Sequence, residues 1–109
     1  MPTTHKILGQ AAPGVGAAFD LYTVPTGKSA VLSTLSVCNY GAGTAAYSIR
    51  VRKAGASPEN KQLLASNSFL IENETVLLTI GVTLSAGDVI SVITATGTAA
   101  FQAFGAEVE

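Results

Sequence analysis

The sequence has little charge and no tryptophan, and its shortage of charge excludes one large class of function. Of its 109 residues, 12% are charged, whereas an average soluble domain has about 25%. The net charge of −1 and the pI of about 5.7 exclude the basic surface with which proteins bind DNA or RNA. A surface built from Ala, Ser, Thr and Gly instead suits a protein that packs against neighbouring subunits.

Cysteine and histidine each occur once, and this limits the chemistry that the chain can perform. Cys38 has no second cysteine to pair with, so an internal disulfide and a multi-cysteine zinc site are excluded. His5 lies near the N-terminus, outside any expected cleft, whereas a catalytic thiol or serine would need a histidine beside it. The acidic residues form neither a catalytic carboxylate pair nor a calcium loop. The sequence therefore predicts a protein that is not an enzyme and that holds no metal or cofactor.

The stretch Thr26-Gly27-Lys28-Ser29 matches the end of a nucleotide-binding P-loop, G-x-x-x-x-G-K-[ST]. Tyr22 stands where that motif needs its first glycine. Residues 29–38, which follow, are rich in β-branched and small residues and lack the polar face of a helix. We therefore expect a turn at 24–27 followed by a strand, and no nucleotide site.

Long apolar runs are also missing. No run approaches the 18 or so residues that span a bilayer. Residues 1–6 lack the apolar run of a signal peptide. We expect a chain that is synthesised in the cytoplasm and does not enter a membrane.

Turn signals recur along the whole chain, in the rhythm typical of an all-β sandwich or barrel. The fold class that we predict is a single antiparallel β-sandwich, jelly-roll-like, with about eight strands. The expected strands are residues 5–10, 17–24, 28–39, 44–53, 61–71, 74–80, 87–95 and 98–108. Residues 1–16 are expected to be an N-terminal arm or first edge strand, and residues 17–109 the sandwich domain.

Two of these strands are apolar on both faces. In the strand at 87–95, Val89 and Ile93 lie on one face and Ile90 and Val92 on the other. In the strand at 98–108, Phe101 lies on one face and Phe104 on the other. A two-layer sandwich covers one face of each strand, so we expect another subunit to cover the second face. Alternation elsewhere predicts the core to be drawn from Leu21, Val31, Leu35, Val37, Tyr47, Ile49, Val51, Leu64, Leu70, Leu77, Ile80, Leu84, Val89, Ile93 and Phe101.

Most of the chain resembles small β-sandwich virion proteins of tailed bacteriophages. The resemblance lies in ILGQAAPGVGAAFDLYTVPTGKSAVLSTLSVCNYGAGTAAYSIRVRKAG at 7–55, GVTLSAGDVISV at 81–92 and FQAFGAEVE at 101–109. The shared pattern is a strand ending L-Y-T-V-P, a P-x-G-K turn, a long strand ending near C-N and a later L-x-x-G-D-x-I turn.

This resemblance implies a non-enzymatic structural protein on the outside of the virion. One possibility is a head decoration (cement) protein, which clamps neighbouring major capsid subunits; such proteins are often trimeric. The other is a tail, baseplate or fibre-associated subunit. The implied partners are further copies of the chain and the phage major capsid protein or tail proteins.

Five residues are candidates for the partner interface: His5, Ile7, Leu8, Tyr40 and Phe104. The first three lie in a segment that forms either the first edge strand or an arm that adds a strand to a neighbouring sheet. Tyr40, beside Gly41, is the aromatic residue most suited to stack against a sugar. A carbohydrate-binding module is therefore the alternative from another class of function.

Overall fold

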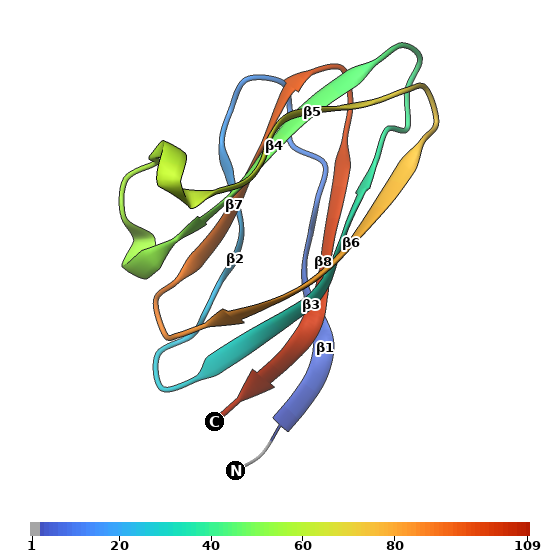
Figure 1. Cartoon of the computed structure of the whole chain (residues 1–109). Coiled ribbons are helices and arrows are strands. Elements are labelled where there is room, and N and C mark those ends of the chain that lie inside the picture. Colours follow the sequence, from blue (N-terminus) through green and yellow to red (C-terminus); the bar gives the residue numbers. More distant parts are fainter. Residues whose placement is uncertain (1–2) are drawn as a thin grey trace.

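The computed structural model describes residues 3–109, which form eight strands in two sheets packed face to face (Figure 1). The strands are β1 (Thr3–Ala11), β2 (Phe19–Thr23), β3 (Ser29–Cys38), β4 (Ala45–Arg52), β5 (Leu63–Leu70), β6 (Thr75–Leu84), β7 (Val89–Thr96) and β8 (Ala100–Val108). Two short 3₁₀ turns, η1 (Lys53–Gly55) and η2 (Asn60–Gln62), lie in the connection between β4 and β5.

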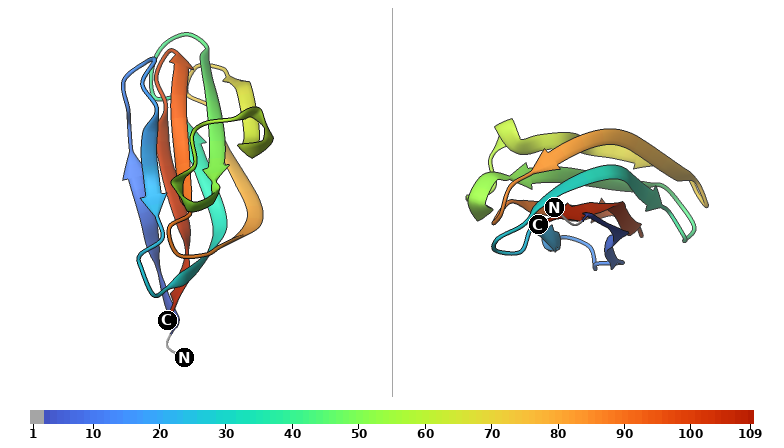
Figure 2. Two further views of the ribbon diagram at one scale, coloured as in Figure 1. Left: turned by 90° about the vertical axis from the view of Figure 1, so that its left-hand side faces the viewer. Right: turned by 90° about the horizontal axis from the view of Figure 1, so that it is seen from below.

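The strand order identifies the topology. Sheet A has the order β1-β8-β3-β6, sheet B has the order β2-β7-β4-β5, and all neighbouring strands are antiparallel. Every connection except the one from β4 to β5 crosses from one sheet to the other, which is the arrangement of an eight-stranded jelly roll. The predicted all-β sandwich of eight strands is thus confirmed. The molecule is a flat body of 45 × 27 × 19 Å, and β1 begins where β8 ends (Figure 2).

The stretch that resembles a P-loop forms the tight turn between β2 and β3. The backbone N–H of Lys28 donates to the carbonyl of Pro25 at 3.2 Å. Gly27 has φ 83°, which glycine adopts without strain at the third position of such a turn. The turn therefore spans 25–28, one residue later than expected, and leads into a strand.

Shifts of register cross sheet A near the middle of its strands. One lies between Ile7 and Gly9 in β1, and another lies between Leu32 and Thr34 in β3. At each of these two shifts the strand has one extra residue that has no partner on the neighbouring strand β8. Such a residue reverses the alternation of side chains along its strand. As a result Leu32, on one side of the shift, and Leu35, on the other, both point into the core and are fully buried.

Five residues predicted for the core do not belong to it. The shifts account for Val31, Leu64 and Ile80, whereas Leu77 points outward by the regular alternation of β6. Ile93 is half-buried on the face of β7 that points away from sheet A. Val31, Leu64, Leu77 and Ile80 are exposed, with exposed fractions of 39%, 45%, 65% and 39%. In β6 the residues that pack against the core are Val76, Leu78, Val82 and Leu84 instead. Leu64 lies in β5, where the register also shifts against β4.

The second face of β7 is covered by its own chain at Val89 and Ser91, so this part needs no second subunit to cover it, whereas Ile93, further along the same face, is half-buried. Val89 and Ser91 are each only 5% exposed, although both point away from sheet A. Asp20 pairs with Ser91 in register and Arg52 pairs with Val89, so their 2.8 Å ion pair passes over the outer side of β7. The 3₁₀ turn η1 packs beside it.

The N-terminal segment pairs with its own chain. Residues 3–11 are β1, the edge strand of sheet A, in antiparallel register with β8. The predicted segment also includes Met1 and Pro2, which lie outside the described residues.

Candidate interaction surface

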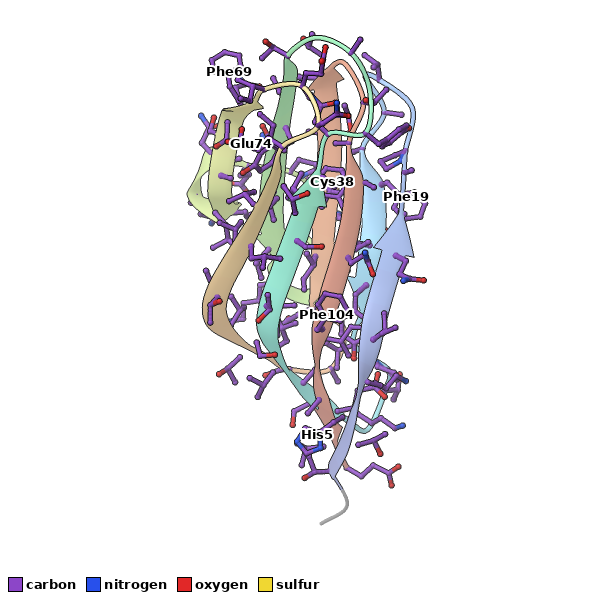
Figure 3. All side chains as sticks on the ribbon, turned by 90° about the vertical axis from the view of Figure 1, so that its right-hand side faces the viewer. His5, Phe19, Cys38, Phe69, Glu74 and Phe104 are labelled. Atoms are coloured by element: carbon purple, nitrogen blue, oxygen red, sulfur yellow. The ribbon has the colours of Figure 1, made fainter. Side chains whose placement is uncertain are left out.

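The side of sheet A that faces away from sheet B, here called the outer face, is the best candidate for a functional surface (Figure 3). Its large apolar side chains are Ile7, Val31 and Leu77, with exposed fractions between 39% and 65%, and the half-buried Phe104. By the alternation of the strands, no Asp, Glu, Lys or Arg of β1, β3, β6 or β8 points to this face, and its ionisable side chains are those of His5 and Cys38. Exposed apolar side chains gathered on one face of a soluble protein favour contact with another macromolecule.

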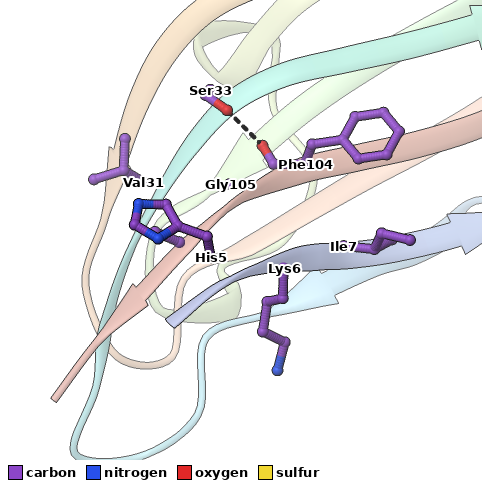
Figure 4. Close-up of a pocket in the computed structure, with 8 residues that line it drawn as sticks. His5, Lys6, Ile7, Val31, Ser33, Phe104 and Gly105 are labelled. Carbon is purple, nitrogen blue, oxygen red and sulfur yellow. Dashed lines mark hydrogen bonds between the residues drawn. The ribbon is translucent and has the colours of Figure 1, made fainter. Parts of the chain in front are cut away.

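A trough of about 670 Å³ runs across the outer face where β1, β8 and β3 lie side by side (Figure 4). His5 and Ile7 of β1 line one wall, and Val31 of β3 lines the other. Gly105 and Ala106 of β8 lie between them, and these small residues leave the trough open. The trough is therefore walled mainly by apolar atoms and suits an apolar side chain of a partner better than a charged ligand.

The backbone beneath the trough is fixed by hydrogen bonds. Ser33, the extra residue of β3, donates its Oγ to the carbonyl of Phe104 at 3.1 Å (Figure 4). Lys6, although adjacent to the trough, points to the other side of β1, where its Nζ lies 3.1 Å from Glu107 Oε1. The cation is thus removed from the outer face by the alternation of β1.

Three of the five residues predicted for the interface come together on the outer face. His5, Ile7 and Phe104 all line the trough. Leu8 is only 9% exposed and belongs to the core, because it follows the outward-pointing Ile7 in the alternation of β1 and so points inward. Tyr40 is 55% exposed but lies in the connection from β3 to β4, at the opposite end of the sandwich from His5.

The loops around Tyr40 are joined by a single buried amide. Asn39 is 1% exposed, and its Nδ2 donates to the carbonyls of Gly43, Leu70 and Ile71 at 2.8, 3.3 and 3.1 Å. Its Oδ1 accepts from the backbone N–H of Gly41 at 3.1 Å and from Thr98 Oγ1 at 3.0 Å. One side chain therefore connects the β3–β4, β5–β6 and β7–β8 loops.

A second buried polar cluster holds β1 at the other end of the molecule. The Glu107 side chain is 5% exposed and accepts hydrogen bonds from Tyr22 Oη at 2.6 Å and Lys6 Nζ at 3.1 Å. Lys28 Nζ lies 3.7 Å from Glu107 Oε1. The Tyr22 and Lys6 hydrogen bonds lower the pKa of Glu107 against the opposing effect of burial. Burial and the neighbouring carboxylate raise the pKa of Tyr22, so its hydroxyl stays protonated and donates.

This cluster predicts a specific dependence of stability on pH. Because the pKa of Glu107 is lowered in the folded state, its contribution to the free energy of unfolding is complete above about pH 4.3 and disappears as the pH falls through the lowered value. We expect Glu107→Gln to be less stable than the wild type at pH 7 by about 1.5–3 kcal/mol, and this difference to shrink steadily towards pH 2. Urea unfolding at several pH values measures it. The control is Glu72→Gln, an exposed residue without an ion pair in the described part of the chain, and an equal loss in both variants would contradict the prediction.

Residues 3–109 contain no group of three or more His, Cys, Asp or Glu side chains placed to hold a metal ion. Cys38 is a free, half-buried thiol. No helix within those residues is long and apolar enough to cross a membrane.

Comparisons with known proteins give little further information. No protein-family model matches the chain, and no curated protein matches it. Among solved structures, a chain in the structure of infectious bursal disease virus, Gx strain, is similar, with a TM-score of 0.47 and 10% sequence identity. The match covers 97% of this chain but only 30% of the viral chain. A similarity at this level identifies neither a family nor a function, and the resemblance to tailed-phage virion proteins stays a prediction.

Proposed function

We propose that this protein is a non-enzymatic structural component of a phage particle, and specifically a decoration protein on the outside of the head. In this role the outer face of sheet A binds the shell and bridges neighbouring major capsid subunits. The observation that carries the proposal is the combination, on one face of a flat molecule, of exposed apolar side chains with an absence of charge.

Physical chemistry favours a protein surface as the partner of this face. Burial of its apolar side chains is favourable by roughly 25 cal/mol per Å². No buried charge has to be compensated, since the Lys6 ammonium and the Glu107 carboxylate pair on the inner side of sheet A. On a shell, many weak contacts of this kind combine through high effective concentration. Self-association, which the resemblance implies as trimers, would multiply the contacts further.

Binding to particles tests the proposal directly. We expect the purified protein to co-sediment with phage heads that lack it, and Ile7→Lys to lower its affinity at least tenfold, because the variant buries a charge at the centre of the contact. The matched control is Leu64→Lys, which changes an equally exposed apolar residue on β5 of sheet B. Binding to tails alone would indicate a tail or baseplate subunit instead, and equal losses in both variants would exclude the outer face as the docking surface.

A further inference from the structure

We propose that a second copy of this chain pairs with β6, edge to edge and antiparallel, about a two-fold axis that passes beside Leu77. The inference deepens the proposed self-association and names its contact. It does not depend on whether the protein binds a head or a tail.

The strand β6 is an open edge of sheet A. It pairs with β3 on one side, and no strand among residues 3–109 pairs with its other side (Figure 3). An open edge presents a row of backbone N–H and C=O groups that can accept a further strand. The edge available for such pairing is ten residues long, from Thr75 to Leu84.

The other three edge strands carry features that discourage pairing. In β1 these are the charged Lys6 and a register shift. Five residues make up β2, which contains Asp20 and another shift. Two shifts occur in β5, whose Asn67 has φ 46°. Charges, short length and bulges of this kind are the devices by which natural sheets protect their edges.

By contrast, the first half of β6 lacks such protection. Its register shift lies between Thr79 and Val82, so residues 75–79 are regular. No charged residue or proline occurs between Glu74 and Asp88. Leu77, at the centre of the regular stretch, is 65% exposed.

The sequence of this stretch is suited to antiparallel pairing with a second copy of itself. Thr75-Val76-Leu77-Leu78-Thr79 reads almost the same in both directions. In an antiparallel pair centred on Leu77, each Thr75 lies opposite Thr79 of the second copy, each Val76 opposite Leu78, and the two Leu77 side chains meet across the axis. Threonine thus pairs with threonine and aliphatic residues pair with aliphatic residues, which are favourable cross-strand combinations.

The flanking charges favour the antiparallel arrangement over a parallel one. Glu74 immediately precedes the regular stretch. In the proposed pair it lies opposite Ile80 of the second copy, so the two Glu74 side chains are about 20 Å apart along the strands. A parallel pair in register would place the two carboxylates side by side, and like charges directly opposite are destabilising.

Pairing through β6 joins the two copies of sheet A into one continuous eight-stranded sheet. The two outer faces then form a single, larger apolar surface that could contact two neighbouring capsid subunits at once. The β6 edge supports such two-fold pairs rather than the trimers that the resemblance implies.

Charge substitutions at Leu77 test the pairing in the isolated protein. We expect the wild type to form dimers in sedimentation equilibrium between about 10 μM and 1 mM, since an interface of five residue pairs is small. Leu77→Lys and Leu77→Glu should each weaken dimerisation at least tenfold, because like charges would meet across the axis. An equimolar mixture of the two variants should restore it. Leu64→Lys, on the edge strand of sheet B, should leave it unchanged.

Disulfide trapping tests the position of the axis. Residues opposite each other in antiparallel strands have Cα atoms about 4.5–5.5 Å apart, within the range that a disulfide spans. In a Cys38→Ser background, Leu77→Cys should therefore give covalent dimers under mild oxidation, and Leu64→Cys should not.

Four results would overturn the proposal: a wild type that is monomeric at about 1 mM, dimers that Leu77→Lys does not weaken, trimers insensitive to it, or no cross-linking at position 77. Because both experiments use the protein alone, failure to bind phage heads would count against the proposed function and leave the β6 pairing untouched.

Discussion

Replacing Gly105 with alanine is expected to destabilise the protein by about 3 kcal/mol or more. A Cβ at this position would collide with the backbone carbonyl oxygen of Val31, and it would lie 3.2 Å from Leu32 Cα. These atoms belong to the central strand β3, hydrogen-bonded on both sides, so they cannot move without disturbing the pairing with β6 and β8. The glycine lets β8 pass close to the shifted part of β3.

Urea unfolding of Gly105→Ala and of a control variant, Gly14→Ala, measures this effect. Gly14 lies in the β1–β2 loop with nothing within 4 Å of an added Cβ, and its φ is not positive. Its substitution should change the free energy of unfolding by no more than about 0.5 kcal/mol. If both variants unfold at the wild-type midpoint, the close approach of β8 and β3 does not exist.

Replacing Asn39 with alanine should cost about 3 kcal/mol and loosen one whole end of the molecule. The substitution removes all five side-chain hydrogen bonds of the amide and leaves its buried partners unsatisfied. Asn39→Asp should be no better, because a carboxylate cannot donate to the carbonyls of Gly43, Leu70 and Ile71 and would lie against their oxygens.

Hydrogen exchange distinguishes this effect from a general loss of stability. In Asn39→Ala, the backbone amides of Asn39, Gly41 and Glu74, which are hydrogen-bonded within these loops, should exchange faster than the global unfolding of the variant permits. Asn60→Ala, at the exposed start of η2, is the control and should exchange as the wild type does. Uniform acceleration along all eight strands would contradict the assigned role of Asn39.

The sequence was sufficient to predict the number of strands and their approximate positions in the chain. Each strand is bounded by turn residues with a local mechanism, such as Pro25 and Gly27 before β3 or Gly87 before β7, and these signals do not depend on distant contacts. Alternation then placed Tyr47 and Ile49 correctly in the core, because β4 keeps its phase over residues 45–49.

The interaction surface was harder to predict, because it depends on register shifts. A single extra residue in β3 moved Val31 from the expected core to the outer face, and the irregularity in β6 left Ile80 exposed. Gly81, with φ 58°, and Ser33 are the residues in the sequence that mark these places, since small residues inside an apolar strand are typical of bulges. The cover of β7 by the Asp20–Arg52 ion pair joins residues far apart in the chain, and no local pattern indicates it.

The central claim is that the protein belongs to the outside of a phage head. Immunogold electron microscopy of intact particles from a lysate of the source phage, with antibody raised against the recombinant protein, tests it most directly. The account predicts gold distributed over the heads. Gold confined to one end of the particle would assign the protein to the tail, and particles without gold would contradict a role in the virion.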